Sequence, residues 1–77
     1  MNLLSESDLQ RLENARIKGE ALTLDRYLRN YRVFATIKPA PAIWYPVEFL
    51  IQIRQIRGNI VTLQNFRNIE ELKGYLK

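Results

Sequence analysis

The stretch from Val47 to Gln64 places the tightest limits on how this chain of 77 residues can fold. Apolar residues occupy alternate positions from Val47 onward. Because successive side chains of a strand point to opposite faces, the pattern predicts an extended strand with one dry face and one wetter face. A glycine, Gly58, follows, and a second strand is expected over Ile60–Gln64. The two segments therefore predict a β-hairpin.

The length of the connection decides which face each residue of the second strand takes. A two-residue loop of Gly58 and Asn59 would set Ile53 opposite Gln64, so that dry and polar residues share a face. A three-residue loop, Arg57–Asn59, sets Ile53 opposite Leu63, and this is the register that we predict. The dry face is then Val47, Phe49, Ile51, Ile53, Val61 and Leu63, and the other face is Leu50, Gln52, Arg54, Ile56, Ile60, Thr62 and Gln64.

Two helices are predicted before the first strand. The first begins near Ser5 or Ser7, which are good N-caps, and ends at Gly19. The second begins at Thr23, because a stripe of apolar and aromatic residues follows it at helical spacing: Leu24, Tyr27, Leu28 and Tyr31.

The rest of the chain predicts a sheet and a final helix. Alternation over Arg32–Lys38 indicates the first strand, which the prolines at 39 and 41 end. Helical spacing of apolar residues after Gln64 indicates the last helix. The predicted fold is one two-layer α+β domain over residues 1–77, with two N-terminal helices, a three-stranded antiparallel meander and a C-terminal helix (ααβββα).

The residue types exclude much familiar chemistry. The chain has no cysteine and no histidine, which removes Ser-His-Asp and Cys-His catalysis and the usual zinc sites. The three glycines, at 19, 58 and 74, lie too far apart for a phosphate-binding loop. We predict no enzymatic activity, no metal, no cofactor and no small-molecule ligand. Because no signal peptide or membrane-length apolar run is visible, we expect a cytoplasmic protein without a membrane partner.

The second face of the sheet is the candidate functional surface, because it is too apolar to be left bare and too polar for an interior. Its arginine and aromatic residues are typical of protein–protein hot spots. Trp44 either joins this face or caps the core edge. The partner is another protein or a second copy of the chain, since so small a core gains from association. The predicted partner-binding residues are Arg32, Phe34, Lys38, Trp44, Leu50, Gln52, Arg54, Ile56 and Ile60.

Nucleic-acid binding is the alternative function. The net charge of +4, from 12 basic and 8 acidic residues, favours contact with polyanions. One continuous basic surface would favour RNA or DNA, whereas arginines scattered around an apolar centre would favour a protein partner. The candidate nucleic-acid contacts, from the predicted second helix and the sheet, are Arg26, Arg29, Arg32, Lys38 and Arg54.

Overall fold

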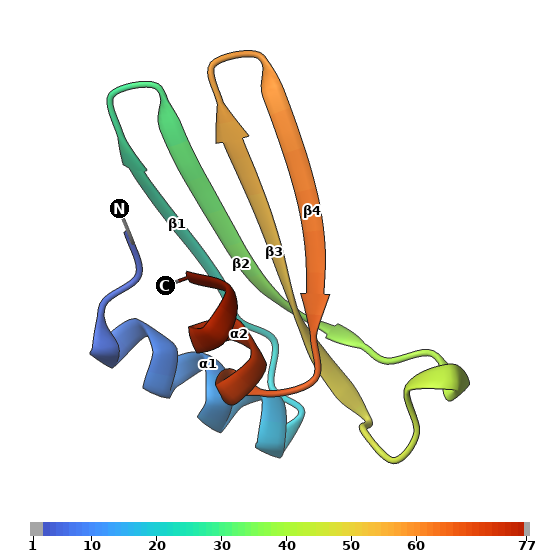
Figure 1. The fold of residues 1–77 in the computed structure, drawn as a ribbon. Coiled ribbons are helices and arrows are strands. Elements are labelled where there is room, and N and C mark those ends of the chain that lie inside the picture. The colour runs from blue at the N-terminus through green and yellow to red at the C-terminus, as the bar shows by residue number, and fades with distance from the viewer. Residues whose placement is uncertain (1–2, 77) are drawn as a thin grey trace.

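The computed structural model describes residues 3–76 as an α+β fold in which two helices lie against one side of a four-stranded antiparallel sheet (Figure 1). The strands follow one another in chain order across the sheet. In sequence, the elements are α1 (Glu6–Lys18), β1 (Thr23–Leu28), β2 (Tyr31–Pro39), the 3₁₀ turn η1 (Ala42–Trp44), β3 (Phe49–Arg57), β4 (Ile60–Phe66) and α2 (Ile69–Leu76).

The prediction of a second N-terminal helix is wrong, because residues 23–28 form strand β1, and the fold is αββββα rather than ααβββα. Leu24 and Arg26 share the side that faces the helices, where Leu24 is buried. Arg26 is acceptable there because its Nη2 and Nε donate to the Asp8 carboxylate of α1, at 2.9 and 3.2 Å. Because Arg26 is charged, β1 does not show the alternation of apolar and polar residues that is typical of a strand. Its partner Asp8, which explains why a charge can lie on the inner side, is 18 positions earlier in the chain.

The predicted β3–β4 register is also wrong. The connection is the two-residue loop Gly58-Asn59, with Gly58 at a φ of +60°. Ile53 therefore lies opposite Gln64, and Arg54 lies opposite Leu63. Polar residues of β4 can lie on the helix side of the sheet without losing contact with water, because β4 is an edge strand and residues 60–65 are all exposed to solvent.

This register moves five residues to the opposite face from the one predicted. Val61 and Leu63 lie on the side away from the helices, whereas Ile60, Thr62 and Gln64 lie on the helix side. The odd-numbered residues of β3, such as Ile51 and Ile53, face the helices as expected and are fully buried. The strand itself begins at Phe49 and not at Val47.

The N-terminal helix is confirmed, with its cap fixed at Ser5. The Ser5 hydroxyl accepts a hydrogen bond from the Asp8 amide at 3.1 Å, and the Asp8 carboxylate accepts one from the Ser5 amide at 3.2 Å. This reciprocal capping box satisfies two amides that the helix start leaves without intrahelical partners. Gly19 ends the helix in the left-handed conformation, as predicted.

A single core joins the two layers. It is formed by one face of α1, the inward residues of the sheet and Leu72 of α2, all within one cluster. The helices cover one end of the sheet, and the tips of both hairpins extend beyond them (Figure 1). Neither helix in residues 3–76 has the length and apolar character needed to cross a membrane.

Candidate functional site

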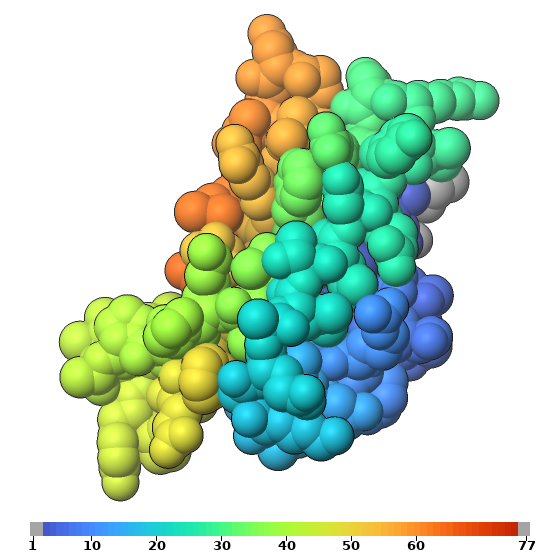
Figure 2. Space-filling model, turned by 180° about the vertical axis from the view of Figure 1, so that it is seen from behind, coloured from blue at the N-terminus to red at the C-terminus, as the bar shows by residue number. Residues whose placement is uncertain are grey.

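The candidate surface lies on the open face of the sheet, opposite α1 and α2. Figure 2 shows this side, where the upper parts of the strands, coloured teal to orange, lie at the surface with no helix over them. The strand register places two neighbouring rows of side chains across all four strands. We call these eight residues the open-face patch: Tyr27, Arg32, Ile56 and Val61 in one row, and Asp25, Phe34, Arg54 and Leu63 in the next.

Apolar side chains in the open-face patch are strongly exposed. The exposed fractions are 73% for Tyr27, 55% for Leu63 and 53% for Val61. Phe34 and Ile56 between them are half-buried. The patch borders a shallow hollow of about 470 Å³, lined by Tyr27, Arg29, Asn30, Arg32 and Ile56. Scattered apolar residues are normal on a surface, whereas a contiguous exposed group of this kind is a candidate contact site.

One ion pair lies within the open-face patch. Arg32 donates from Nη2 and Nε to the two carboxylate oxygens of Asp25, at 2.6 and 3.0 Å. The hydrogen bond from Arg32 lowers the pKa of Asp25 below its ordinary value, and the same bond raises the pKa of Arg32. The guanidinium carbon of Arg32 also lies 4.5 Å from the centre of the Phe34 ring. The Arg32 side chain is therefore held in place by contacts with both Asp25 and Phe34.

Seven of the nine predicted partner-binding residues lie on the open face. They are Arg32, Phe34, Lys38, Leu50, Gln52, Arg54 and Ile56. Leu50 is nevertheless only 3% exposed, so it is unavailable for contact. Ile60 is 66% exposed but belongs to the helix side of the sheet, because of the two-residue loop.

Trp44 lies outside the four strands of the sheet. It lies in η1, within the loop of residues 40–48 that projects from the body of the molecule (Figure 2). Its ring is half-buried, and the guanidinium carbon of Arg67 lies 5.4 Å from the ring centre. Alternation does not continue past Pro46, because this turn interrupts the extended chain.

The five candidate nucleic-acid contacts do not converge. Arg26 is on the helix side and is paired with Asp8, and Arg29 sits in the β1–β2 turn. Arg32, Lys38 and Arg54 share the open face, but Arg32 is already paired. Among the described residues, Lys38 and Arg54 form no ion pair.

Four patch residues were not in the predicted site: Asp25, Tyr27, Val61 and Leu63. A signal for Val61 and Leu63 was present, because Gly-Asn is a favoured two-residue hairpin loop. Tyr27 had no such signal, since its spacing to Leu24, Leu28 and Tyr31 fits a helix equally well.

Within residues 3–76, no three acidic side chains cluster so that they could hold a metal ion. Comparison with protein-family models, curated proteins and solved structures found no match to this chain.

Proposed function

We propose that this chain is a non-catalytic interaction module that docks on a partner protein through the open-face patch. The observation that carries the proposal is the exposure of Tyr27, Val61 and Leu63 beside two guanidinium groups, in one continuous area. Removing apolar area from water is favourable by about 25 cal/mol per Å². Aromatic and arginine side chains at the centre of such an area are the usual source of binding energy.

The charge of the face favours an acidic partner over a second copy of the chain. Arg32, Lys38 and Arg54 lie on it, against the single acid Asp25, which Arg32 already neutralises. Two copies packed face to face would bring Lys38 and Arg54 toward like charges, which is unfavourable when water is excluded. A segment with apolar side chains and carboxylates complements the face.

The same geometry supports nucleic-acid binding less well. Single strands bind open sheets by stacking bases on aromatic rings. The Phe34 ring is already contacted by the Arg32 guanidinium, and Ile56, Val61 and Leu63 are aliphatic. Only Tyr27 presents an exposed ring in the open-face patch. Scattered arginines around an apolar centre favour a protein partner.

The proposal is tested with a displayed library of random 12-residue peptides as the probe. Selection against the folded chain should enrich peptides that combine Leu, Ile or Phe with Asp or Glu. Leu63→Glu should weaken the binding of an enriched peptide by about tenfold or more, because it places a carboxylate among the apolar side chains of the patch. Amide chemical shifts should change mainly at the open-face patch.

Ile60→Glu is the matched control. It introduces the same charge on the same strand, at a side chain of similar exposure that faces the other way. This variant should change peptide affinity by less than about twofold. Equal losses for the two variants would contradict the assignment of the face. Tight binding of oligothymidylate that weakens steeply with salt would favour nucleic acid instead.

A further inference from the structure

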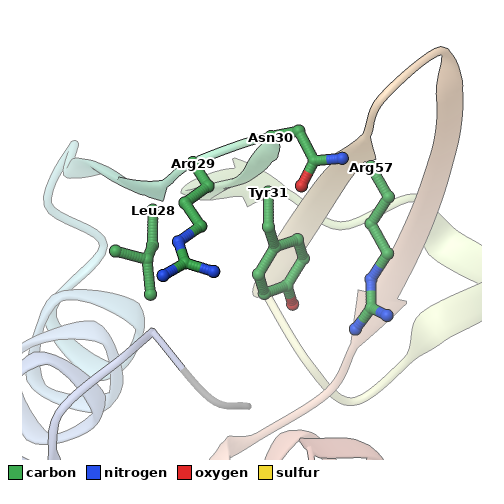
Figure 3. Close-up of a pocket in the computed structure, with 5 residues that line it drawn as sticks. All are labelled: Leu28, Arg29, Asn30, Tyr31 and Arg57. Atoms are coloured by element: carbon green, nitrogen blue, oxygen red, sulfur yellow. The ribbon is translucent and has the colours of Figure 1, made fainter.

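The tips of the two hairpins form a second hollow, on the helix side of the sheet and beyond the ends of the helices (Figures 1 and 3). Its volume is about 580 Å³, within the size range of small-ligand sites. The Gly58 amide donates to the Asn30 carbonyl at 2.9 Å and so ties one tip to the other. We call this the hairpin-tip hollow, and its lining residues are Leu28, Arg29, Asn30, Tyr31 and Arg57.

Within residues 3–76, no carboxylate pairs with the two guanidinium groups that border the hairpin-tip hollow. In Figure 3, Arg29 and Arg57 lie on either side of the Tyr31 ring and extend from the sheet in the same direction. The ion pairs among the described residues are Arg16–Glu13, Arg26–Asp8, Arg32–Asp25 and Lys73–Glu6. With respect to the part of the chain that the structure describes, both groups are therefore free to bind an anion from solution.

Arg57 is positioned in advance. Its guanidinium carbon lies 4.5 Å from the centre of the Tyr31 ring, and the Tyr31 hydroxyl donates to Oε1 of the buried Gln55 at 3.3 Å. A guanidinium that stacks on a ring still presents its N–H donors in its own plane. Less conformational freedom is then lost when these donors bind an anion.

Arg29 occupies a backbone position that favours glycine. It has a φ of +58°, and Gly58 has a φ of +60° at the equivalent place in the other hairpin. Each is the first residue of a two-residue loop, followed by Asn30 or Asn59. L-residues are strained at positive φ, and strain of this kind clusters at binding sites. Local preference does not explain an arginine here, whereas a role for its side chain does.

We propose that the hairpin-tip hollow binds a phosphate monoester with an apolar or aromatic body. Two guanidinium groups match the charge of roughly −1.5 to −2 that a phosphate monoester carries at neutral pH, and guanidinium binds phosphate oxygens in pairs. Leu28, which is 46% exposed, and Tyr31 supply an apolar wall for the body of the ligand. The site departs from the expectation that the chain takes no small-molecule ligand.

Phenyl phosphate is the probe, titrated at low salt by calorimetry or by amide chemical shifts. Binding should saturate, with shifts at the hairpin tips. Arg57→Gln and Arg29→Gly should each weaken it about tenfold or more, because each removes a charged donor. Arg29→Gly also relieves the positive φ, so its urea midpoint should be no lower than that of the parent chain. A loss of binding then has no explanation in unfolding.

Arg54→Gln is the matched control, since it removes the same charge from β3 on the opposite face. It should change the affinity by less than about twofold. An equal loss would show general charge attraction and overturn the site, as would the absence of saturable binding. Leu63→Glu should leave phenyl phosphate binding unchanged. A negative result for the hairpin-tip hollow would therefore say nothing against the open-face patch, and the reverse also holds.

Two further ligands define the anion. Benzoate, with a single negative charge, should bind more weakly than phenyl phosphate, and equal affinity would overturn the assignment to phosphate. Oligothymidylate should bind more tightly with a 5′-phosphate than without one if a chain end is the source of the monoester. Equally tight binding of both oligonucleotides would mean that internal diesters are recognised, which also overturns the proposal.

Discussion

Adjacent residues of β1 carry opposite charges, and each finds its partner on a different side of the sheet. Arg26 points inward to Asp8 of α1, and Asp25 points outward to Arg32 of β2. Asp8 also closes the capping box with Ser5. At the scale of single residues, one carboxylate therefore both starts α1 and fastens it to the edge strand.

Asp8→Asn should lower the free energy of unfolding by about 1–2 kcal/mol near neutral pH. Burial raises the pKa of Asp8, but hydrogen bonds from Arg26 and Ser5 together lower it below 3.8. The unfolded chain then binds the proton more tightly. The stabilisation by Asp8 is present above the unfolded pKa and is lost as the pH falls through the folded pKa.

Urea unfolding at neutral pH and in acid measures this effect. The difference between the parent chain and Asp8→Asn should shrink as the pH is lowered, because the parent loses the same charge. Asp25→Asn is the control, and it should change unfolding less, since that pair is exposed on both sides. A difference that stays constant into strong acid would rule out the charged pair as the cause.

At the scale of elements, the length of the two-residue loop decides which side chains of β4 lie on each face of the sheet. Arg57 and Ile60 flank the loop, so Ile56 and Val61 are the next directly opposite pair, both on the open face. In an antiparallel hairpin, such a pair alternates with the hydrogen-bonded ones and has its Cα atoms about 4.5 Å apart. This separation suits a disulfide.

The register predicts that Ile56→Cys combined with Val61→Cys forms a disulfide on mild oxidation. The chain has no other cysteine, so mass spectrometry with and without reductant gives a clear result. The control pairs Ile56→Cys with Ile60→Cys, which the three-residue loop would place opposite each other. In the observed register those side chains point to opposite faces and should remain reduced. If only the control pair formed a disulfide efficiently, the result would contradict the observed register and support the register with a three-residue loop.

At the scale of the whole molecule, two helices cover one end of one face of the sheet (Figure 1). The opposite face holds the open-face patch, and the uncovered end holds the hairpin-tip hollow. Among the residues whose burial the structure describes, every buried apolar residue except Leu50 belongs to one cluster, so the domain depends on that cluster for its stability.

Leu12→Ala should therefore lower the free energy of unfolding by about 2–4 kcal/mol, which is a large part of the total free energy of unfolding of a small domain. Leu12 is fully buried on the inner face of α1. Ile17, on the same helix, is 67% exposed, and Ile17→Ala should cost about 0.5 kcal/mol or less. Urea unfolding followed by circular dichroism compares the two. Similar effects would contradict a single core beneath α1.

Much of this arrangement was predictable from local patterns. The capped helix that ends at Gly19, the strands at Arg32–Lys38 and around Ile51, and the final helix are confirmed. The odd and even positions of β2 and β3 also take the faces predicted for them. These features depend on spacing within a few residues, which fixes the direction of each side chain relative to its neighbours.

By itself, the sequence determined that helices combine with an antiparallel sheet, which faces the side chains of the two central strands take, and which residue types are available for chemistry. The tertiary structure decided that residues 23–28 are a strand and that Val61 and Leu63 face outward. The reason is physical: Arg26 is accepted on the inner side because its guanidinium is paired with Asp8, and Gln64 because residues 60–65 of the edge strand β4 stay exposed to solvent. Neither condition can be seen in the local pattern, because each depends on what another segment does in space.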